Sequence, residues 1–170
     1  IIMIGGKLIA TGSDSCVFKP NIPCKGKKDV SDKRVSKLVY ADNSKKLMND
    51  EKKENSMIAK IKNYKDWAII FDEYCEAPDF KTIEKYDQDI YTCMSNRQYQ
   101  NIYTIKDDFD NLNSHMLNGP AGGESLYEYF IKHFVKIKTL KNLEKEFLKL
   151  MIMMKPLFLG IKELIKNNIV

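Results

Sequence analysis

The run Asn-Gly-Pro-Ala-Gly-Gly at residues 118–123 is the feature that most constrains the fold, because the sequence changes character across it. Before it, short β-prone segments alternate with clusters of turn residues, and after it almost every residue up to Asn168 favours a helix. Strands followed by helices predict an α+β fold, with a small antiparallel sheet layer attached to a helical layer. We therefore expect a strand-rich part at 1–117, a connector at 118–123 and a helical part at 124–170.

The strand-rich part opens with a hairpin signal. Residues 6–11 and 16–19 are β-prone runs separated by a Gly-Ser-Asp-Ser turn cluster, and residues 35–40 follow as a third strand after a lysine-rich loop. Helix formers over 44–62 predict a helix whose latter half packs inward, because its apolar residues gather there. We expect further strands at 67–71, 102–105 and 112–117, and an irregular excursion at 72–101.

The helical part is expected to hold two or three helices. One covers 124–137, where apolar residues recur on one face, and one or two more cover 140–167. Pro156 is expected to kink or divide the latter, because a proline within a helix loses a hydrogen bond and clashes with the preceding turn.

Composition narrows the class of protein. With 44% hydrophobic and 30% charged residues, the 170-residue chain fits one globular domain or a piece of a larger one, and not a collagen-like or wholly disordered protein. The four cysteines form no Cys-x-x-Cys pair and only two histidines accompany them, so we expect neither a disulfide scaffold nor a metal site. We interpret Cys16, Cys24, Cys75 and Cys93 as reduced thiols of an intracellular protein.

Charge is segregated along the chain, although the net charge is only +5. Residues 19–53 and 131–170 are basic, whereas 54–130 carry fourteen acidic residues against seven basic ones. The first basic segment lacks interleaved aromatic residues for stacking bases, so we expect no nucleic-acid partner. We expect no membrane partner either, because the most apolar run, at 147–159, is interrupted by two lysines and falls short of the roughly 20 residues of a spanning helix.

Three features come in an order that suits phosphate binding. A hairpin turn at Gly12 lets backbone approach phosphate oxygens, and Lys37 on a neighbouring strand can reach the same phosphates as a point charge. A partly buried lysine needs an anion to hold it, and Glu54 on the expected helix is the candidate. Asp50 and Glu51 lie on nearby turns of that helix and are the alternatives.

In order and spacing these features resemble the N-terminal lobe of a eukaryotic-type serine/threonine protein kinase. The run at 12–20 is similar to the end of the Gly-rich loop and its second strand, and Val-Ser-Lys at 35–37 is similar to the motif that carries the phosphate-binding lysine. Cys-Val-Phe-Lys-Pro at 16–20 and Ser-Lys-Leu at 36–38 resemble the divergent kinases of large DNA viruses in particular.

The resemblance implies a site for ATP with Mg²⁺. Lys37 would hold the α- and β-phosphates, Glu54 would pair with Lys37, and the hairpin would cover the nucleotide. The implied hairpin residues are Ala10, Gly12, Ser13, Ser15 and Val17, and the implied adenine contacts are backbone groups of Met116, Leu117 and Asn118.

The resemblance also implies that residues 124–170 begin a C-terminal lobe, with the catalytic loop, the Asp-Phe-Gly motif and the magnesium ligands expected beyond Val170. We therefore expect the ATP-binding portion of a kinase that phosphorylates protein hydroxyls, with the rest of the C-lobe as its missing partner. The alternative is a non-catalytic, kinase-like interaction module, so whether this chain alone is an enzyme is left open. The implied location is the host cytoplasm or the virion.

Overall fold

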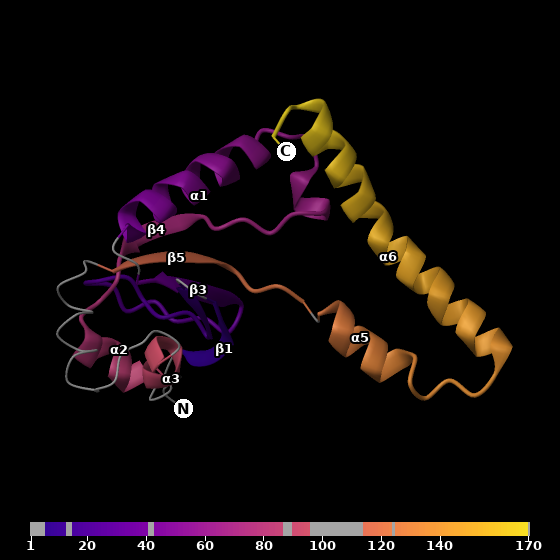
Figure 1. The fold of residues 1–170 in the computed structure, drawn as a ribbon, viewed down its shortest axis with the longest axis horizontal. Coiled ribbons are helices and arrows are strands. Elements are labelled where there is room, and N and C mark those ends of the chain that lie inside the picture. The colour runs from indigo at the N-terminus through magenta and orange to yellow at the C-terminus, as the bar shows by residue number, and fades with distance from the viewer. Residues whose placement is uncertain are drawn as a thin grey trace. The chain divides into compact units, whose positions relative to one another are not determined.

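The computed structural model describes residues 6–12, 15–40, 43–86, 90–95, 114–123 and 125–169 (Figure 1). Two compact units make up the chain: residues 1–55 with 70–121, and residues 56–69 with 122–170. The expected α+β class is confirmed. The expected roles of Ser13 and of a strand at 102–105 lie outside the described residues.

The first unit is built on a five-stranded antiparallel sheet with the order β1-β2-β3-β5-β4. Strand β5 comes last in the chain but lies in the interior of the sheet, between β3 and β4. The expected hairpin and third strand are confirmed. The strands are β1 Lys7–Thr11, β2 Ser15–Lys19, β3 Arg34–Val39, β4 Glu73–Glu76 and β5 His115–Pro120.

Helix α1 (Ser44–Ile58) follows β3 and begins at the expected residue. It ends at Ile58 and not at Lys62, because the chain there passes through turns to Asn63 in the left-handed conformation, with φ 60°. A short 3₁₀ helix, η1 (Tyr64–Asp66), comes next.

Two expectations for the middle of the chain are wrong. The apolar run at 67–71 is not a strand, and the strand is instead the next segment, β4, with the sequence Glu-Tyr-Cys-Glu. An edge strand tolerates such residues because one of its sides is open to solvent. Residues 72–101 are not wholly irregular either, since they also contain α2 (Phe80–Tyr86) and α3 (Ile90–Ser95).

The core lies on the face of the sheet that α2 and α3 cover (Figure 1). Alternation along the strands points one set of side chains to this face, and the helices add apolar residues to it. The fully buried members include Cys16, Phe18, Leu38 and Met116 from the strands and Phe80, Ile83, Ile90 and Cys93 from the helices.

The expectation of reduced thiols is wrong, because Cys16 pairs with Cys93 and Cys24 pairs with Cys75 in disulfides. Sequence separations of 77 and 51 residues hide these pairs, which the sheet brings to Cα distances of 5.9 and 6.0 Å. The inference of an intracellular location rested on reduced thiols, so it loses that support.

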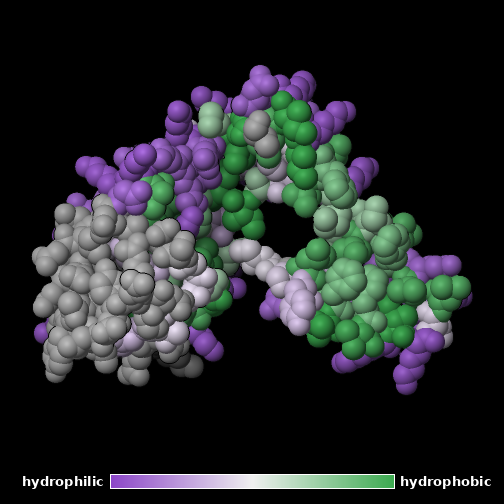
Figure 2. Space-filling view, in the orientation of Figure 1, coloured by the Kyte–Doolittle hydropathy of each residue, from purple (hydrophilic) through white to green (hydrophobic). Residues whose placement is uncertain are grey.

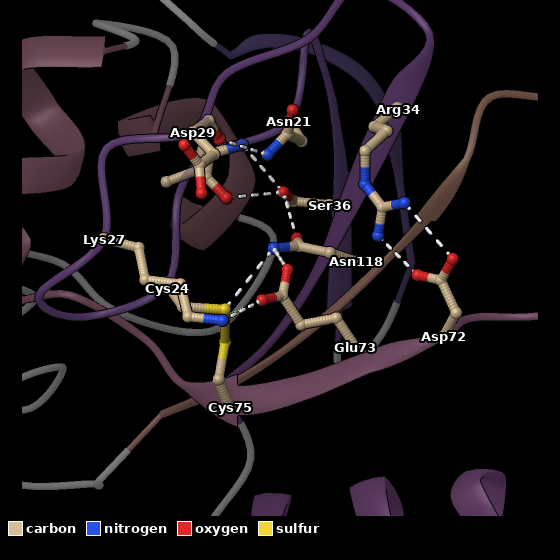
Figure 3. The surroundings of a disulfide bond; sticks show 11 residues. Asn21, Cys24, Lys27, Asp29, Arg34, Ser36, Asp72, Glu73, Cys75 and Asn118 are labelled. Carbon is tan, nitrogen blue, oxygen red and sulfur yellow. Dashed lines mark hydrogen bonds and ion pairs between the residues drawn. A yellow bond between two sulfur atoms is a disulfide. The ribbon is translucent and has the colours of Figure 1, made fainter.

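A polar network with a buried centre and exposed ion pairs fastens the loop before β3 to the edge strand β4 (Figure 3). Asn118 of β5 is fully buried; its Oδ1 lies 2.6 Å from Ser36 Oγ, and its Nδ2 donates to Glu73 Oε2 at 2.9 Å. Glu73 also pairs with Lys27 of the loop at 2.5 Å, and Arg34 pairs with Asp72. We call these contacts of Lys27, Arg34, Asp72, Glu73 and Asn118 the charged strap. The strap covers part of the edge strand β4.

The second unit contains η1, α5 (Leu126–His133) and α6 (Leu140–Lys166). Helix α5 is shorter than expected and begins with a capping box between Ser125 and Glu128. Helix α6 continues through Pro156, so the expected division is wrong. Neither helix, nor any other in the described ranges, is long and apolar enough to cross a membrane.

The second unit exposes many apolar side chains, which appear green over α5 and α6 in Figure 2. Phe147, Ile152 and Phe158 of α6 are each more than half exposed. Packing inside this unit includes a hydrogen bond from the Tyr129 hydroxyl to Glu146, and the contact of Gly160 with the ring of Trp67.

The contact at Gly160 predicts that Gly160→Ala destabilises the second unit. A Cβ at this position would lie 2.2 Å from Trp67 Cδ2, which forces the ring to move. Overpacking costs about 1–3 kcal/mol and outweighs the gain of about 1 kcal/mol from replacing a helical glycine. Trp67 is the single tryptophan, so denaturant unfolding followed by its fluorescence measures both the lower stability and a red-shifted native emission.

The matched control is Gly123→Ala, because no atom lies within 4 Å of a Cβ at Gly123. We expect it to leave the emission of Trp67 unchanged. A Gly160→Ala protein that is more stable than the original would contradict the described contact.

The charged strap predicts that Glu73 stabilises the folded protein in a pH-dependent way. The hydrogen bond from Lys27, then that from Asn118, holds the pKa of the Glu73 carboxyl below its ordinary value of 4.5. Because its pKa is lowered, the ionised Glu73 carboxylate stabilises the folded state above pH 4.5. This stabilisation is lost as the pH falls through the pKa of the folded state. We expect Glu73→Gln to cost about 1 kcal/mol at neutral pH, and the difference from the original protein to shrink below pH 4.5.

Denaturant unfolding at a series of pH values measures this difference. Glu76→Gln is the control, since Glu76 and its partner Lys25 are 67% and 66% exposed and 3.4 Å apart, and exposed pairs contribute little. A cost for Glu73→Gln that stays constant down to acid pH would contradict the role of the Glu73 charge.

Candidate functional site

The candidate site lies on the face of the sheet opposite the core. Strand register places Ala10, Val17, Lys37, Leu117 and Tyr74 side by side, one from each strand. Residues directly opposite in neighbouring strands project to the same face, so these five side chains form one row. Four of the five are residues that the sequence analysis assigned to the nucleotide site.

Helix α1 packs on this face and is attached near both ends. Ser44 Oγ lies 3.0 Å from His115 Nδ1 of β5, and Asn55 Nδ2 donates to the Tyr74 hydroxyl of β4 at 2.7 Å. Both Ser44 and Asn55 are buried. These contacts fix the inner side of α1 over the middle of the sheet.

The central feature of the site is an ion pair between β3 and α1. Lys37 Nζ lies 2.5 Å from Glu51 Oε2, and the two side chains are 28% and 25% exposed. The Lys37 ammonium is also 6.0 Å from the centre of the Phe71 ring, at the limit of a cation–π contact. Glu51 thus holds the lysine in one position on a partly buried surface.

The prediction that Glu54 pairs with Lys37 is wrong. Residues 47, 51 and 54 follow one another along the same side of a helix, so either glutamate is compatible with the sequence. The attachments of α1 at Ser44 and Asn55 set its position, and they place the turn that carries Glu51 over Lys37. Glu54 lies on the next turn and is exposed, although it lines the same pocket.

A pocket of about 360 Å³ opens beside this ion pair. It brings together three of the residues that the sequence analysis assigned to the nucleotide site, which are Gly12, Ser15 and Lys37. The remaining lining residues are Val39, Leu47, Asp50, Glu51 and Glu54. The sequence signal for the last four was the helical spacing 47, 50, 51 and 54, which identifies one side of α1.

Gly12 makes two hydrogen bonds that hold the hairpin turn, one within the turn and one with a residue beyond β3. The Gly12 N–H donates to the Ser15 carbonyl at 2.8 Å, and the Tyr40 hydroxyl is 3.3 Å from the Gly12 carbonyl. The Gly12 amide is therefore engaged within the turn. Among the described residues on this side of the pocket, the Ser15 hydroxyl and the Lys37 ammonium are the groups that can meet an anion.

Backbone groups of residues 116–118 cannot take the expected role of binding an adenine edge. These residues pair with β3 on one side and with β4 on the other, so the ladder uses their donors and acceptors. The Asn118 carbonyl also accepts the Asp72 N–H at 3.1 Å. The Met116 side chain enters the core and that of Asn118 lies in the polar network on the same face of the sheet, so of the three only Leu117 faces the candidate site.

The electrostatics of the pocket are mixed. Lys37 is the cation among its lining residues, and Asp50, Glu51 and Glu54 supply three carboxylates. Within the described part of the chain, no group of three or more His, Cys, Asp or Glu residues is arranged to hold a metal ion. The arrangement can therefore hold a small polar ligand against a fixed ammonium group, beside the three carboxylates that α1 places in the pocket.

Comparisons of this chain with protein-family models, with curated proteins and with solved structures found no match. The functional interpretation accordingly rests on the residues and their geometry.

The ion pair predicts energetic coupling between Lys37 and Glu51 but not between Lys37 and Glu54. A double-mutant cycle with Lys37→Met and Glu51→Gln, measured by denaturant unfolding, is expected to give a coupling of about 1 kcal/mol for this partly exposed pair. The same cycle with Glu54→Gln is the matched control and is expected to give a value near zero. A larger coupling to Glu54 would restore the register inferred from the sequence.

Proposed function

We propose that this chain is the ATP-binding portion of a serine/threonine protein kinase, in which Lys37 holds the phosphates of the nucleotide. The single observation that carries the proposal is the ion pair between Lys37 and Glu51. A strand lysine held by a helix glutamate is the pair that protein kinases need in place for phosphoryl transfer.

The placement of the pair supports the proposal further. The lysine lies on the third strand, and the glutamate lies on the helix that follows that strand. The Gly12 hairpin is at the edge of the same pocket, as expected for a loop that covers phosphates. The pocket's volume of about 360 Å³ falls within the range of small-molecule sites.

The residues present fit a nucleotide in part. The Lys37 ammonium and the Ser15 hydroxyl would hold phosphate oxygens, while Val39 and Leu47, the apolar residues that line the pocket, would contact the base. Asp50 and Glu54 would oppose a bound polyphosphate by charge repulsion. When bound with ATP, Mg²⁺ would supply charge neutralisation at the phosphates.

The proposal predicts that Mg-ATP stabilises the chain through Lys37. We expect a rise in the melting temperature with Mg-ATP concentration, because a ligand that binds the folded state shifts the unfolding equilibrium. The Lys37→Ala variant is expected to lose most of this rise, since the phosphates lose their cation. Thermal unfolding of the full chain with and without Mg-ATP provides the measurement.

The matched control is Lys45→Ala, which removes an exposed lysine of α1 outside the pocket. It is expected to keep the full response to Mg-ATP. Absence of any response in the original protein, or an equal response in the Lys37→Ala variant, would overturn the proposed function.

A further inference from the structure

The two disulfides lie in different surroundings. Cys16 and Cys93 are both 0% exposed and belong to the apolar core cluster, which leaves a reductant no route to their sulfur atoms. Cys24 is 3% exposed, but its partner Cys75 is only partly buried and lies on the edge strand β4. Access by a small thiol therefore differs between the two bonds.

The sulfur of Cys24 has a polar neighbour that the other disulfide lacks among its described contacts. Asn118 Nδ2 donates to Cys24 Sγ at 3.5 Å (Figure 3). The Asn118 amide cannot turn away, because Ser36 holds its Oδ1 and Glu73 accepts from its Nδ2. A fixed N–H aimed at a sulfur stabilises that sulfur as a departing thiolate.

Charge near this bond is balanced. Lys27 pairs with Glu73 at 2.5 Å, and Lys25 pairs with Glu76 at 3.4 Å. The basic and acidic side chains around Cys24 and Cys75 thus compensate one another. The asymmetry between the two sulfur atoms comes from Asn118 and from exposure, which makes Cys75 the sulfur to be attacked and Cys24 the leaving group.

We propose that the Cys24–Cys75 disulfide is a thiol–disulfide exchange site that takes a small dithiol reductant, while Cys16–Cys93 is a permanent bond. A thiolate of the dithiol attacks Cys75 Sγ, the bond to Cys24 Sγ breaks, and Cys24 leaves as a thiolate that then takes a proton from water. The second thiol of the reductant attacks the mixed disulfide and releases Cys75 as a thiol. Two electrons pass to the protein, and the reductant becomes a cyclic disulfide.

Opening this bond is a local event. Strand β4 stays paired with β5, and the core helix α3 stays attached to β2 through Cys16 and Cys93. The loop that contains Cys24 is then held to β4 by the ion pairs of Lys25 and Lys27 and by the Lys25 N–H to the Glu76 carbonyl at 3.3 Å. Reduction therefore replaces a covalent link between the loop and β4 by noncovalent contacts, and salt weakens the ion pairs among them.

The test measures how fast each disulfide opens in the full, oxidised chain. Dithiothreitol is added under native conditions, samples are quenched with iodoacetamide over time, and peptide mass spectrometry counts alkylated cysteines. We expect Cys24 and Cys75 to become alkylated at least about tenfold faster than Cys16 and Cys93, with the circular dichroism unchanged during the fast phase.

Two double variants serve as controls. In Cys16→Ala/Cys93→Ala the remaining bond is expected to open as fast as in the original protein, and in Cys24→Ala/Cys75→Ala the remaining bond is expected to stay slow. Equal rates for the two bonds in the original chain would show that both open by global unfolding and would overturn the proposal. Faster opening of Cys16–Cys93 would overturn it as well.

Discussion

Insertion of β5 between β3 and β4 is the interaction on which the first unit depends. Without it, β4 has no partner among the described strands, and β1–β3 remain a three-stranded meander with an open edge at Lys37. The first four residues of β5 then make separate contributions: His115 meets α1, Met116 enters the core, Leu117 lies beside Lys37 and Asn118 joins the strap. Alternation along one short strand thus supports both faces of the sheet.

Because side chains alternate along each strand, one face of the sheet is apolar and the other is polar. Leu38 faces a core sealed by α2, α3 and the Cys16–Cys93 bond, whereas its neighbour Lys37 faces α1 and the charged pocket. A rigid apolar face behind a strand limits how far its polar face can shift. The ammonium of Lys37 is therefore positioned as much by the packing of its neighbour Leu38 as by its own partner Glu51.

Local signals in the sequence were sufficient to predict the first part of the fold. The Gly12 turn between two β-prone runs, the third strand and the start of α1 at Ser44 each depend on neighbouring residues, and the structure confirms them. Features that depend on residues far apart in the sequence could not be predicted in this way. The cysteine pairs, the edge position of β4 and the choice of Glu51 over Glu54 are all set by strand order and helix attachment, which spacing does not reveal. Pro156 shows the converse, since a local rule predicted a kink or a division there and helix α6 is not divided at this residue.

The order of the strands in the sheet has a consequence for biosynthesis. A ribosome makes β1, β2, β3 and β4 well before β5, which begins at His115, so the growing chain carries two unpaired edges that wait for one strand. Closing a sheet through such distant segments is slow compared with forming helices or hairpins, and open edges invite pairing with other nascent chains. Lys33 and Arg34 at the start of β3 place like charges beside one of these open edges, and charged side chains at a strand edge disfavour pairing between copies of a chain.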